Sequence, residues 1–128
     1  MTVGDGFSGL GRTLHTWDAD VDRVVQRIFN RFNAVSVNTY VCHPFCGWER
    51  RSLDVWGDGG RGDALPALKA ARILDWLFEL PGTPFLRHTI LEHTLWVRGK
   101  GNLPWLRDDH SGPLRHVHAT YLPVPPLR

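Results

Sequence analysis

The chain has 128 residues, of which 42% are hydrophobic and 22% charged, and its formal net charge is +2. This composition is typical of one globular domain, since the chain is too short for two ordinary ones. The arginines are scattered, which argues against a nucleic-acid-binding surface, and no stretch reaches the about 18 apolar residues of a membrane span. We therefore expect a single monomeric domain over 1–128, with its core at about 19–122.

The N-terminal half predicts a helix and then a strand. Apolar residues recur at helical spacing from Val21 to Phe32, with aspartates before them and arginines towards the end, which predicts an amphipathic helix over 19–33. The β-branched run from Val35 to Val41 predicts a strand, which should end before Cys42-His43-Pro44 because proline blocks simple continuation.

A short apolar run, Ser52-Leu53-Asp54-Val55-Trp56, carries a single carboxylate, so Asp54 needs a polar partner if the run is buried. The following segment, 57–62, is rich in glycine but lacks the lysine and hydroxyl of a phosphate-binding loop, and we expect a plain loop. Asp63 then offers an N-cap for a helix over 64–80, which should end before Pro81-Gly82.

The C-terminal part predicts three strands. Residues 87–91 and 94–98 favour a hairpin around Glu92-His93, although that dipeptide is a poor turn signal. A loop over 99–113 follows, and a last strand carries His116 and His118. We expect an α+β domain in which a small antiparallel sheet is covered on one face by the two helices.

The histidine pair in Leu114-Arg115-His116-Val117-His118 is the first indication of chemistry. Alternate strand positions face the same side of a sheet, so the two imidazoles should project together, and neutral imidazole is a common zinc ligand. Two ordinary strand histidines are the alternative interpretation. His43 and Asp54 strengthen the metal interpretation, because two histidines and one carboxylate are a familiar catalytic zinc set that leaves a position open for water.

The order His43, Ser52-Leu53-Asp54 and His116-Val117-His118 resembles the zinc peptidases that share the fold of lysostaphin, D-alanyl-D-alanine peptidases and hedgehog signalling domains. The resemblance covers roughly residues 35–122. Within that group, the run 51–56, the helix after it, Leu95-Trp96 and the closing His-Val-His most resemble small actinobacterial and phage cell-wall peptidase domains.

The resemblance implies that Zn²⁺ is held by His43, Asp54 and His118. It also implies that His116 lies beside the activated water and acts as a base or stabilises the developing oxyanion. The implied substrate is a peptide bond in a peptidoglycan stem peptide or cross-bridge. The chain would then be a zinc-dependent peptidoglycan peptidase similar to a phage lysin.

The chain departs from the group in two places. His43 and Asp54 lie eleven positions apart, whereas members of the group usually place these residues closer together. Either the loop between them bulges or the ligand assignment is wrong. A disulfide between Cys42 and Cys46 would pin this bulge, and a local metal site of Cys42, His43 and Cys46 is the rival interpretation. Many relatives also carry an acidic residue shortly before the third ligand, and this chain has none at that place.

Four further residues are candidates for substrate binding. Arg51 and Arg115 would recognise peptide carboxylates, since guanidinium suits bidentate pairing, and His110 and Asp109 would line the cleft or assist His116. Exposed surface residues are the alternative for the two arginines and His110.

Two other function classes compete with the enzyme. One is a catalytically inactive wall-binding or virion structural module of the same fold. The other is a metal-dependent nuclease, which the scattered arginines disfavour. The N-terminus carries no visible export signal, so action at the bacterial cell wall would need phage release, a virion or an unseen export route.

Overall fold

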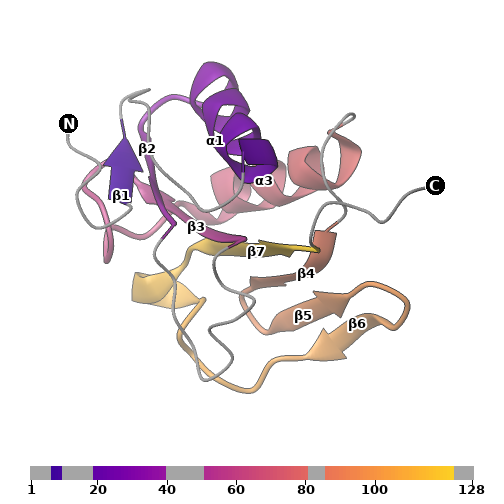
Figure 1. Ribbon diagram of the computed structural model, residues 1–128. Helices are drawn as coiled ribbons and strands as arrows, with labels where there is room; N and C mark the ends of the chain where they lie inside the picture. The colour runs from indigo at the N-terminus through magenta and orange to yellow at the C-terminus, as the bar shows by residue number, and fades with distance from the viewer. Residues whose placement is uncertain (1–6, 10–18, 40–50, 81–85, 123–128) are drawn as a thin grey trace.

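The computed structural model describes residues 7–9, 19–39, 51–80 and 86–122. Within these ranges the chain forms one antiparallel sheet and two α-helices (Figure 1), which confirms the α+β class. The elements are β1 (Phe7–Gly9), α1 (Ala19–Arg31), β2 (Val35–Asn38), β3 (Ser52–Gly57), α3 (Ala67–Glu79), β4 (Leu86–Leu91), β5 (Thr94–Val97), β6 (Gly101–Pro104), a 3₁₀ turn (Gly112–Leu114) and β7 (Val117–Tyr121).

The described strands are ordered β1-β2-β3-β7-β4-β5-β6, and every neighbouring pair is antiparallel. The last strand of the chain, β7, therefore lies in the middle of the sheet, between β3 and β4. A central strand is fixed by hydrogen bonds on both of its edges. The histidine-bearing end of the chain is consequently held in the most constrained part of the fold.

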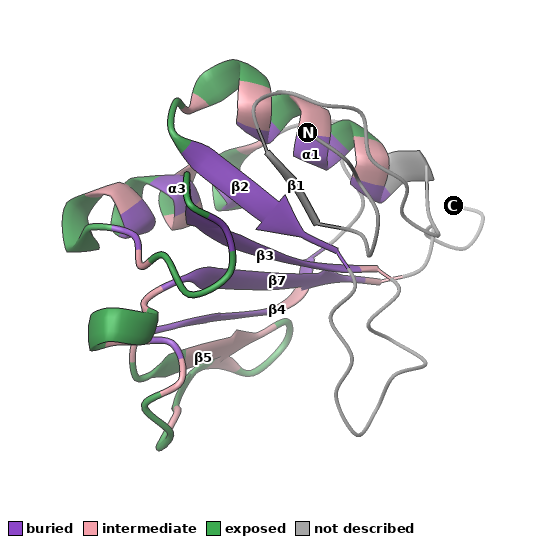
Figure 2. Ribbon diagram, turned by 90° about the vertical axis from the view of Figure 1, so that its left-hand side faces the viewer, coloured by how far each residue is buried: buried purple, intermediate pink, exposed green. Residues whose placement is uncertain are grey.

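One face of the sheet is apolar and both helices cover it, as expected (Figures 1 and 2). Alternate residues of β2, β3 and β7 point to this face and are buried, because side chains on a strand alternate with a period of two. They pack against the apolar stripes of α1 and α3, and this cluster includes Val21, Val24, Val25, Ile28, Val35, Val37, Leu53, Val55, Ala70, Ile73, Leu77, Val117, Ala119 and Tyr121. Each fully buried large aliphatic side chain contributes about 1.5–3 kcal/mol, so this face supplies the stability of the domain.

The opposite face of the same strands is polar and also buried, and in Figure 2 β2, β3 and β7 are purple throughout. Its residues are Ser36, Asn38, Ser52, Asp54, Trp56, His118 and Thr120. The register pairs Asp54 with Asn38 on one side and with His118 on the other. A buried polar face is stable only when its groups bind one another or a ligand.

The sequence prediction was wrong about the start of the second helix. Helix α3 begins at Ala67, and Pro66 precedes it without a side-chain cap. Asp63 does not cap the helix; its carboxylate instead accepts a hydrogen bond of 2.6 Å from the backbone N–H of Gly59. The Gly57 N–H donates to the Asp63 carbonyl at 2.7 Å. The glycine-rich segment is thus a plain loop that closes on Asp63.

The hairpin of β4 and β5 is confirmed, and its turn shows how a poor turn dipeptide is tolerated. Glu92 adopts a left-handed φ of 57°, which is unfavourable for a side chain of this size. Its N–H donates to the carbonyl of His110 at 2.9 Å, and its carboxylate accepts from Arg115 Nε at 2.9 Å. These tertiary contacts hold the turn that local sequence does not encode.

Two strands were not predicted. β6 lies in the segment expected to be a loop, and β1 lies in the glycine-rich start. β6 pairs with β5 alone and contains Pro104, in keeping with the rule that proline occurs in edge strands. In the described parts of the chain, neither helix has the length and apolar character needed to cross a bilayer.

We predict that Tyr121→Phe leaves the free energy of unfolding unchanged or raises it by about 1 kcal/mol. The Tyr121 hydroxyl is buried without a hydrogen-bond partner among the described residues, and burial raises its pKa, so its removal relieves a desolvation cost. Urea unfolding measures the change. Tyr121→Leu is the packing control and should cost more than about 1 kcal/mol. A loss of that size in Tyr121→Phe would reveal a partner for the hydroxyl.

Candidate metal centre

The centre of the polar face is the pair Asp54 and His118. The two residues lie directly opposite each other on β3 and β7, and His118 Nδ1 is 2.7 Å from Asp54 Oδ1. Asp54 is only 9% exposed and His118 only 1%. Because a carboxylate only accepts, Nδ1 carries the proton and donates it. The polar partner that the sequence required for Asp54 is therefore His118.

The charge state of Asp54 follows from two opposing effects. Burial alone raises the pKa of the carboxyl, but the hydrogen bond from His118 and the nearby imidazoles outweigh it, so the pKa lies below its ordinary value. Asp54 is consequently ionised at neutral pH. A buried anion of this kind attracts a cation or a proton donor.

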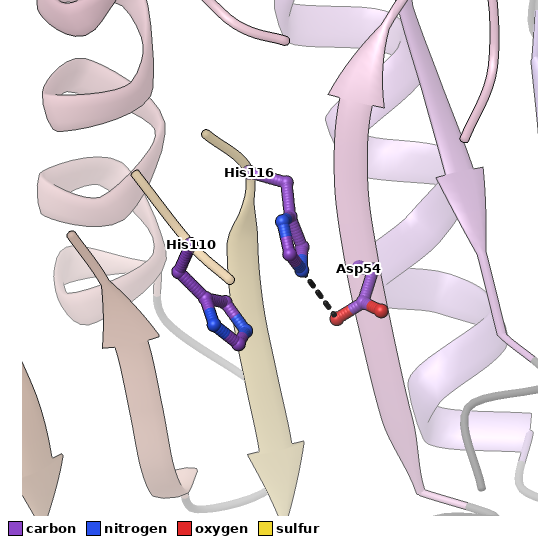
Figure 3. Close-up of side chains that lie close together, drawn as sticks. All are labelled: Asp54, His110 and His116. Carbon is purple, nitrogen blue, oxygen red and sulfur yellow. Dashed lines mark ion pairs between the residues drawn. The ribbon is translucent and has the colours of Figure 1, made fainter. Parts of the chain in front are cut away.

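His116 approaches Asp54 from the end of the sheet, one residue before β7 begins. Its Nε2 is 3.8 Å from Asp54 Oδ1 (Figure 3), and its Nδ1 donates to the carbonyl of Leu114 at 2.8 Å. The ring stacks on Trp56, with centroids 3.9 Å apart and planes 11° apart. The expectation that the two histidines project to one side is confirmed. In the neutral ring, the Nε2 lone pair faces the carboxylate.

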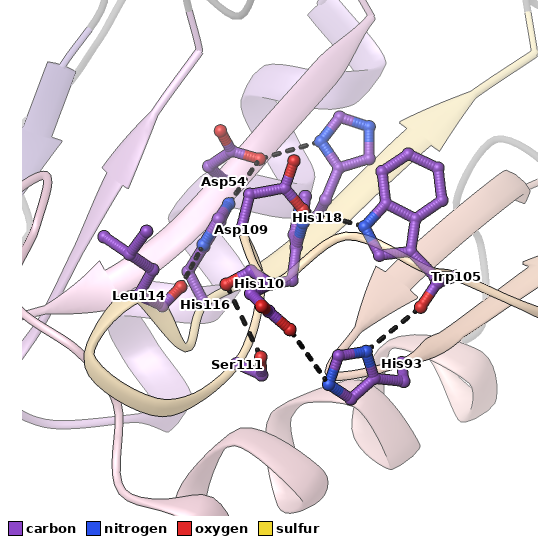
Figure 4. A network of polar contacts seen from close by, with 10 residues as sticks. Asp54, His93, Trp105, Asp109, His110, Ser111, Leu114, His116 and His118 are labelled. Atoms are coloured by element: carbon purple, nitrogen blue, oxygen red, sulfur yellow. Dashed lines mark hydrogen bonds and ion pairs between the residues drawn. The ribbon is translucent and has the colours of Figure 1, made fainter.

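His110 completes the cluster from the loop before the 3₁₀ turn. Its ring stacks on that of His116 with centroids 4.1 Å apart. Its Nδ1 donates to Asp109 Oδ1 at 2.7 Å, and the same oxygen accepts from Trp105 Nε1 at 2.7 Å (Figure 4). Asp109 therefore fixes the proton of His110 on Nδ1 and leaves the Nε2 lone pair available.

The loop that carries His110 is held by the turn of the β4–β5 hairpin. Besides the contact from Glu92 to the His110 carbonyl, the N–H of Trp105 donates to the carbonyl of His93 at 2.8 Å, and His93 Nδ1 donates to the carbonyl of Trp105 at 3.1 Å. His93 Nε2 also lies 3.5 Å from Asp108. These contacts position His110 over the polar face, although it is distant from Asp54 in sequence.

The resulting donor set fits a metal ion. Asp54, His110 and His116 are buried, and each offers one ligand atom, all within 4.8 Å of one another. Burial, followed by the effect of His116, lowers the pKa of His110 to about 4, and burial also lowers that of His116, so both rings are neutral at pH 7. The unprotonated Nε2 atoms of His110 and His116 and the Asp54 carboxylate are all electron-pair donors, and none of them donates a hydrogen to another. A divalent cation would bind to such a set.

The distances from Asp54 Oδ1 to the nearest imidazole nitrogens can be compared with the spacing of ligand atoms around zinc. Tetrahedral zinc with bonds of about 2.0–2.1 Å places its ligand atoms about 3.3 Å apart. The Asp54 to His118 contact of 2.7 Å is shorter than this and the Asp54 to His116 contact of 3.8 Å is longer. Each of the two distances differs from the tetrahedral spacing by roughly half an ångström.

The other predicted site residues fall in different places. His43, Cys42 and Cys46 lie outside the described residues, as does the expected strand beyond Thr39. Arg115 donates to Glu92 and, at 3.2 Å, to the carbonyl of Leu65, so its guanidinium braces the hairpin turn. Arg51 immediately precedes β3 and is partly exposed.

Sequence reasoning underestimated three aromatic residues. His110 was a candidate to line the cleft or assist His116, with an exposed loop residue as the alternative; it is buried and belongs to the cluster. His88 on β4 was not a candidate and stacks against His118, with ring centroids 5.2 Å apart. Trp56 packs on His116, and its Nε1 has no hydrogen-bond partner among the described residues. The adjacent Asp109 was the only sequence signal for His110.

Comparisons of the chain with protein-family models, with curated proteins and with solved structures find no match.

We predict that the metal-free protein loses stability as the pH falls from about 6.5 to about 4. The pKa of His110 is lower in the folded state (about 4) than its ordinary value of 6.5. The unfolded chain therefore binds more protons at this position in this window, and the contribution of His110 to the loss levels off below it. Each unit of pKa difference corresponds to about 1.4 kcal/mol, so the decrease should reach a few kcal/mol.

Urea unfolding with a chelator between pH 7 and pH 4 measures this slope. His110→Asn should flatten it, because one titrating group is gone, while Lys100→Ala, at an exposed residue of the turn between β5 and β6, is the control and should keep it. An equally steep slope in His110→Asn would assign the pH dependence to other groups.

Proposed function

We propose that the chain is a zinc-dependent peptidase that cleaves peptide bonds in peptidoglycan and has the fold of the group it resembles in sequence. One observation carries the proposal: an ionised buried carboxylate is surrounded by His110, His116 and His118 on a polar sheet face. Three buried histidines around one carboxylate are costly in a merely structural role. They are the donors that zinc prefers.

In this proposal Asp54 and His118 are zinc ligands, and His43 is the third. The support for the pair is its position, since both residues lie on central strands and their ligand atoms are already adjacent. When bound, zinc would act as a Lewis acid that activates water for attack on a carbonyl carbon. Rigid strands are better supports for such a centre than loops are.

His116 would be the general base. Its tautomer is set by the Leu114 carbonyl, which accepts from Nδ1 and leaves Nε2 free to take a proton. The stack on Trp56 holds the plane of the ring. After Nε2 accepts the proton of the attacking water, Asp54 at 3.8 Å stabilises the imidazolium. The same nitrogen can then return the proton to the leaving amine.

His110 and Asp109 would support His116 from the other side. The His110 ring covers that of His116, and the Asp109 carboxylate adds negative charge that favours the protonated base. Arg115 acts in this proposal as a brace of the turn rather than as a ligand for the substrate. Action at the bacterial cell wall, as a phage lysin or a virion-associated enzyme, is part of the proposal.

The alternative is a wall-binding or virion module of the same fold without metal. Such a module would not need neutral lone pairs held beside an anion, so the orientation of His110 and His116 favours the enzyme. Metal content separates the two functions.

We predict that the purified wild type binds about one zinc ion per chain and lowers the turbidity of a cell-wall suspension. His118→Ala should lose both properties, because it removes a ligand. His116→Ala should keep most of its zinc and lose activity by about 10²–10⁴-fold, because it removes the base. Zinc is measured by elemental analysis and activity by the rate of clearing.

Lys100→Ala, which changes an exposed residue of the turn between β5 and β6, is the control and should retain zinc and activity. If the wild type neither contains nor takes up zinc, the enzyme is excluded and the metal-free module stands. If His110→Ala loses zinc and His118→Ala retains it, the ion lies between Asp54, His110 and His116 instead.

A further inference from the structure

The series of side-chain hydrogen bonds that begins with Asp54 and His118 continues beyond His118 to two hydroxyl groups. His118 Nε2 is 2.8 Å from Thr120 Oγ1, and Thr120 Oγ1 is 2.7 Å from Ser52 Oγ. Ser52 and Thr120 face each other across β3 and β7, just as Asp54 and His118 do. The four side chains thus form one line, Ser52, Thr120, His118, Asp54, in which both hydroxyl groups are fully buried.

The direction of this line is set by Asp54 in the metal-free protein. The carboxylate accepts from Nδ1 of His118, and when the ring carries this one proton, Nε2 has a lone pair and accepts. Thr120 therefore donates to Nε2, and Ser52 donates to Thr120. Every hydrogen bond in the line points towards the carboxylate.

A hydroxyl at position 120 permits the opposite direction as well. A carbonyl there would accept only and an ammonium would donate only, whereas a hydroxyl does both by rotating its O–H bond. The same holds for Ser52. The two residues can therefore serve either tautomer of His118.

We propose that Thr120, supported by Ser52, is a positioning residue that lets His118 exchange its tautomer when metal binds. The proposal rests on the proposed function, in which His118 Nδ1 is a zinc ligand. In the loaded protein Nε2–H donates to Thr120, Thr120 donates to Ser52, and the Nδ1 lone pair faces the ion. Metal-bound histidines generally donate their second N–H to a fixed acceptor, and Thr120 is that acceptor here.

The protons balance without a change of charge on the ring. One proton leaves Nδ1 to water as the ion enters, and one is taken up from water at Nε2. The O–H bonds of Thr120 and Ser52 rotate and do not break.

The order Asp54, His118, Thr120 also resembles the carboxylate, histidine and hydroxyl of a nucleophilic triad. Burial argues against that role, because the Thr120 hydroxyl lies in the middle of the sheet with 0% exposure and is hydrogen-bonded to Ser52. A nucleophile must reach its substrate. The Thr120 and Ser52 hydroxyls instead hold the His118 ring in place through its Nε2 atom.

The test compares Thr120→Val, which deletes the hydroxyl at nearly constant volume, with Thr120→Ser, which retains it. Thr89→Val is the matched control, because Thr89 is a buried threonine on β4 that pairs with Ala119 and so lies on the opposite face. Zinc affinity is measured by competition with a chelator. Nitrogen NMR of the histidine rings reports the His118 tautomer with and without zinc.

We expect Thr120→Val to weaken zinc binding by about 10- to 100-fold, Thr120→Ser to restore it to within a few-fold, and Thr89→Val to bind like the wild type. In the wild type, zinc should move the His118 proton from Nδ1 to Nε2. Unchanged affinity in Thr120→Val overturns this proposal alone. A proton that remains on Nδ1 in the loaded wild type overturns it and also removes His118 Nδ1 from the zinc ligands of the proposed function. A wild type that binds no zinc overturns the proposed function as well.

Discussion

The contact between Asp54 and His118 is the interaction on which the site depends. A carboxylate buried in the middle of a sheet is stable as an anion only with a partner, and the register of β3 and β7 supplies one directly opposite it. A slip of one residue would turn Asp54 into the apolar core and expose Leu53 to the polar face. The pair therefore constrains both the pairing of the strands and the chemistry of the face they present.

The apolar face of the sheet supplies the stability of the domain, and the polar face carries the candidate site. Helices α1 and α3 bury the apolar face, and this core holds β3 and β7 rigid. The polar face can then carry groups that do not pack for stability. The β4–β5 turn determines the position of His110, because Glu92, His93 and Arg115 hold the loop that brings His110 over Asp54. An apolar core, a central strand and one turn are sufficient to place the cluster.

Features encoded by local periodicity were predictable from the sequence. The first helix, predicted over 19–33 and observed at Ala19–Arg31, the hairpin and the common face of His116 and His118 all follow from spacings of three to four or of two residues. The position of His110 was not predictable, because it depends on contacts with the Glu92 turn that are distant in sequence. The start of α3 was misjudged since Asp63 binds Gly59, an equally local alternative to capping. The ligand role of His43 depends on residues 40–50, which lie outside the described ranges.

X-ray absorption of the zinc-loaded protein tests the central claim most directly, because bond lengths distinguish the ligands. A centre on the polar face predicts a first shell of nitrogen and oxygen at about 2.0–2.1 Å with the outer-shell signal of imidazole rings. A shell of sulfur at about 2.3 Å would place the ion on Cys42 and Cys46 and contradict the account.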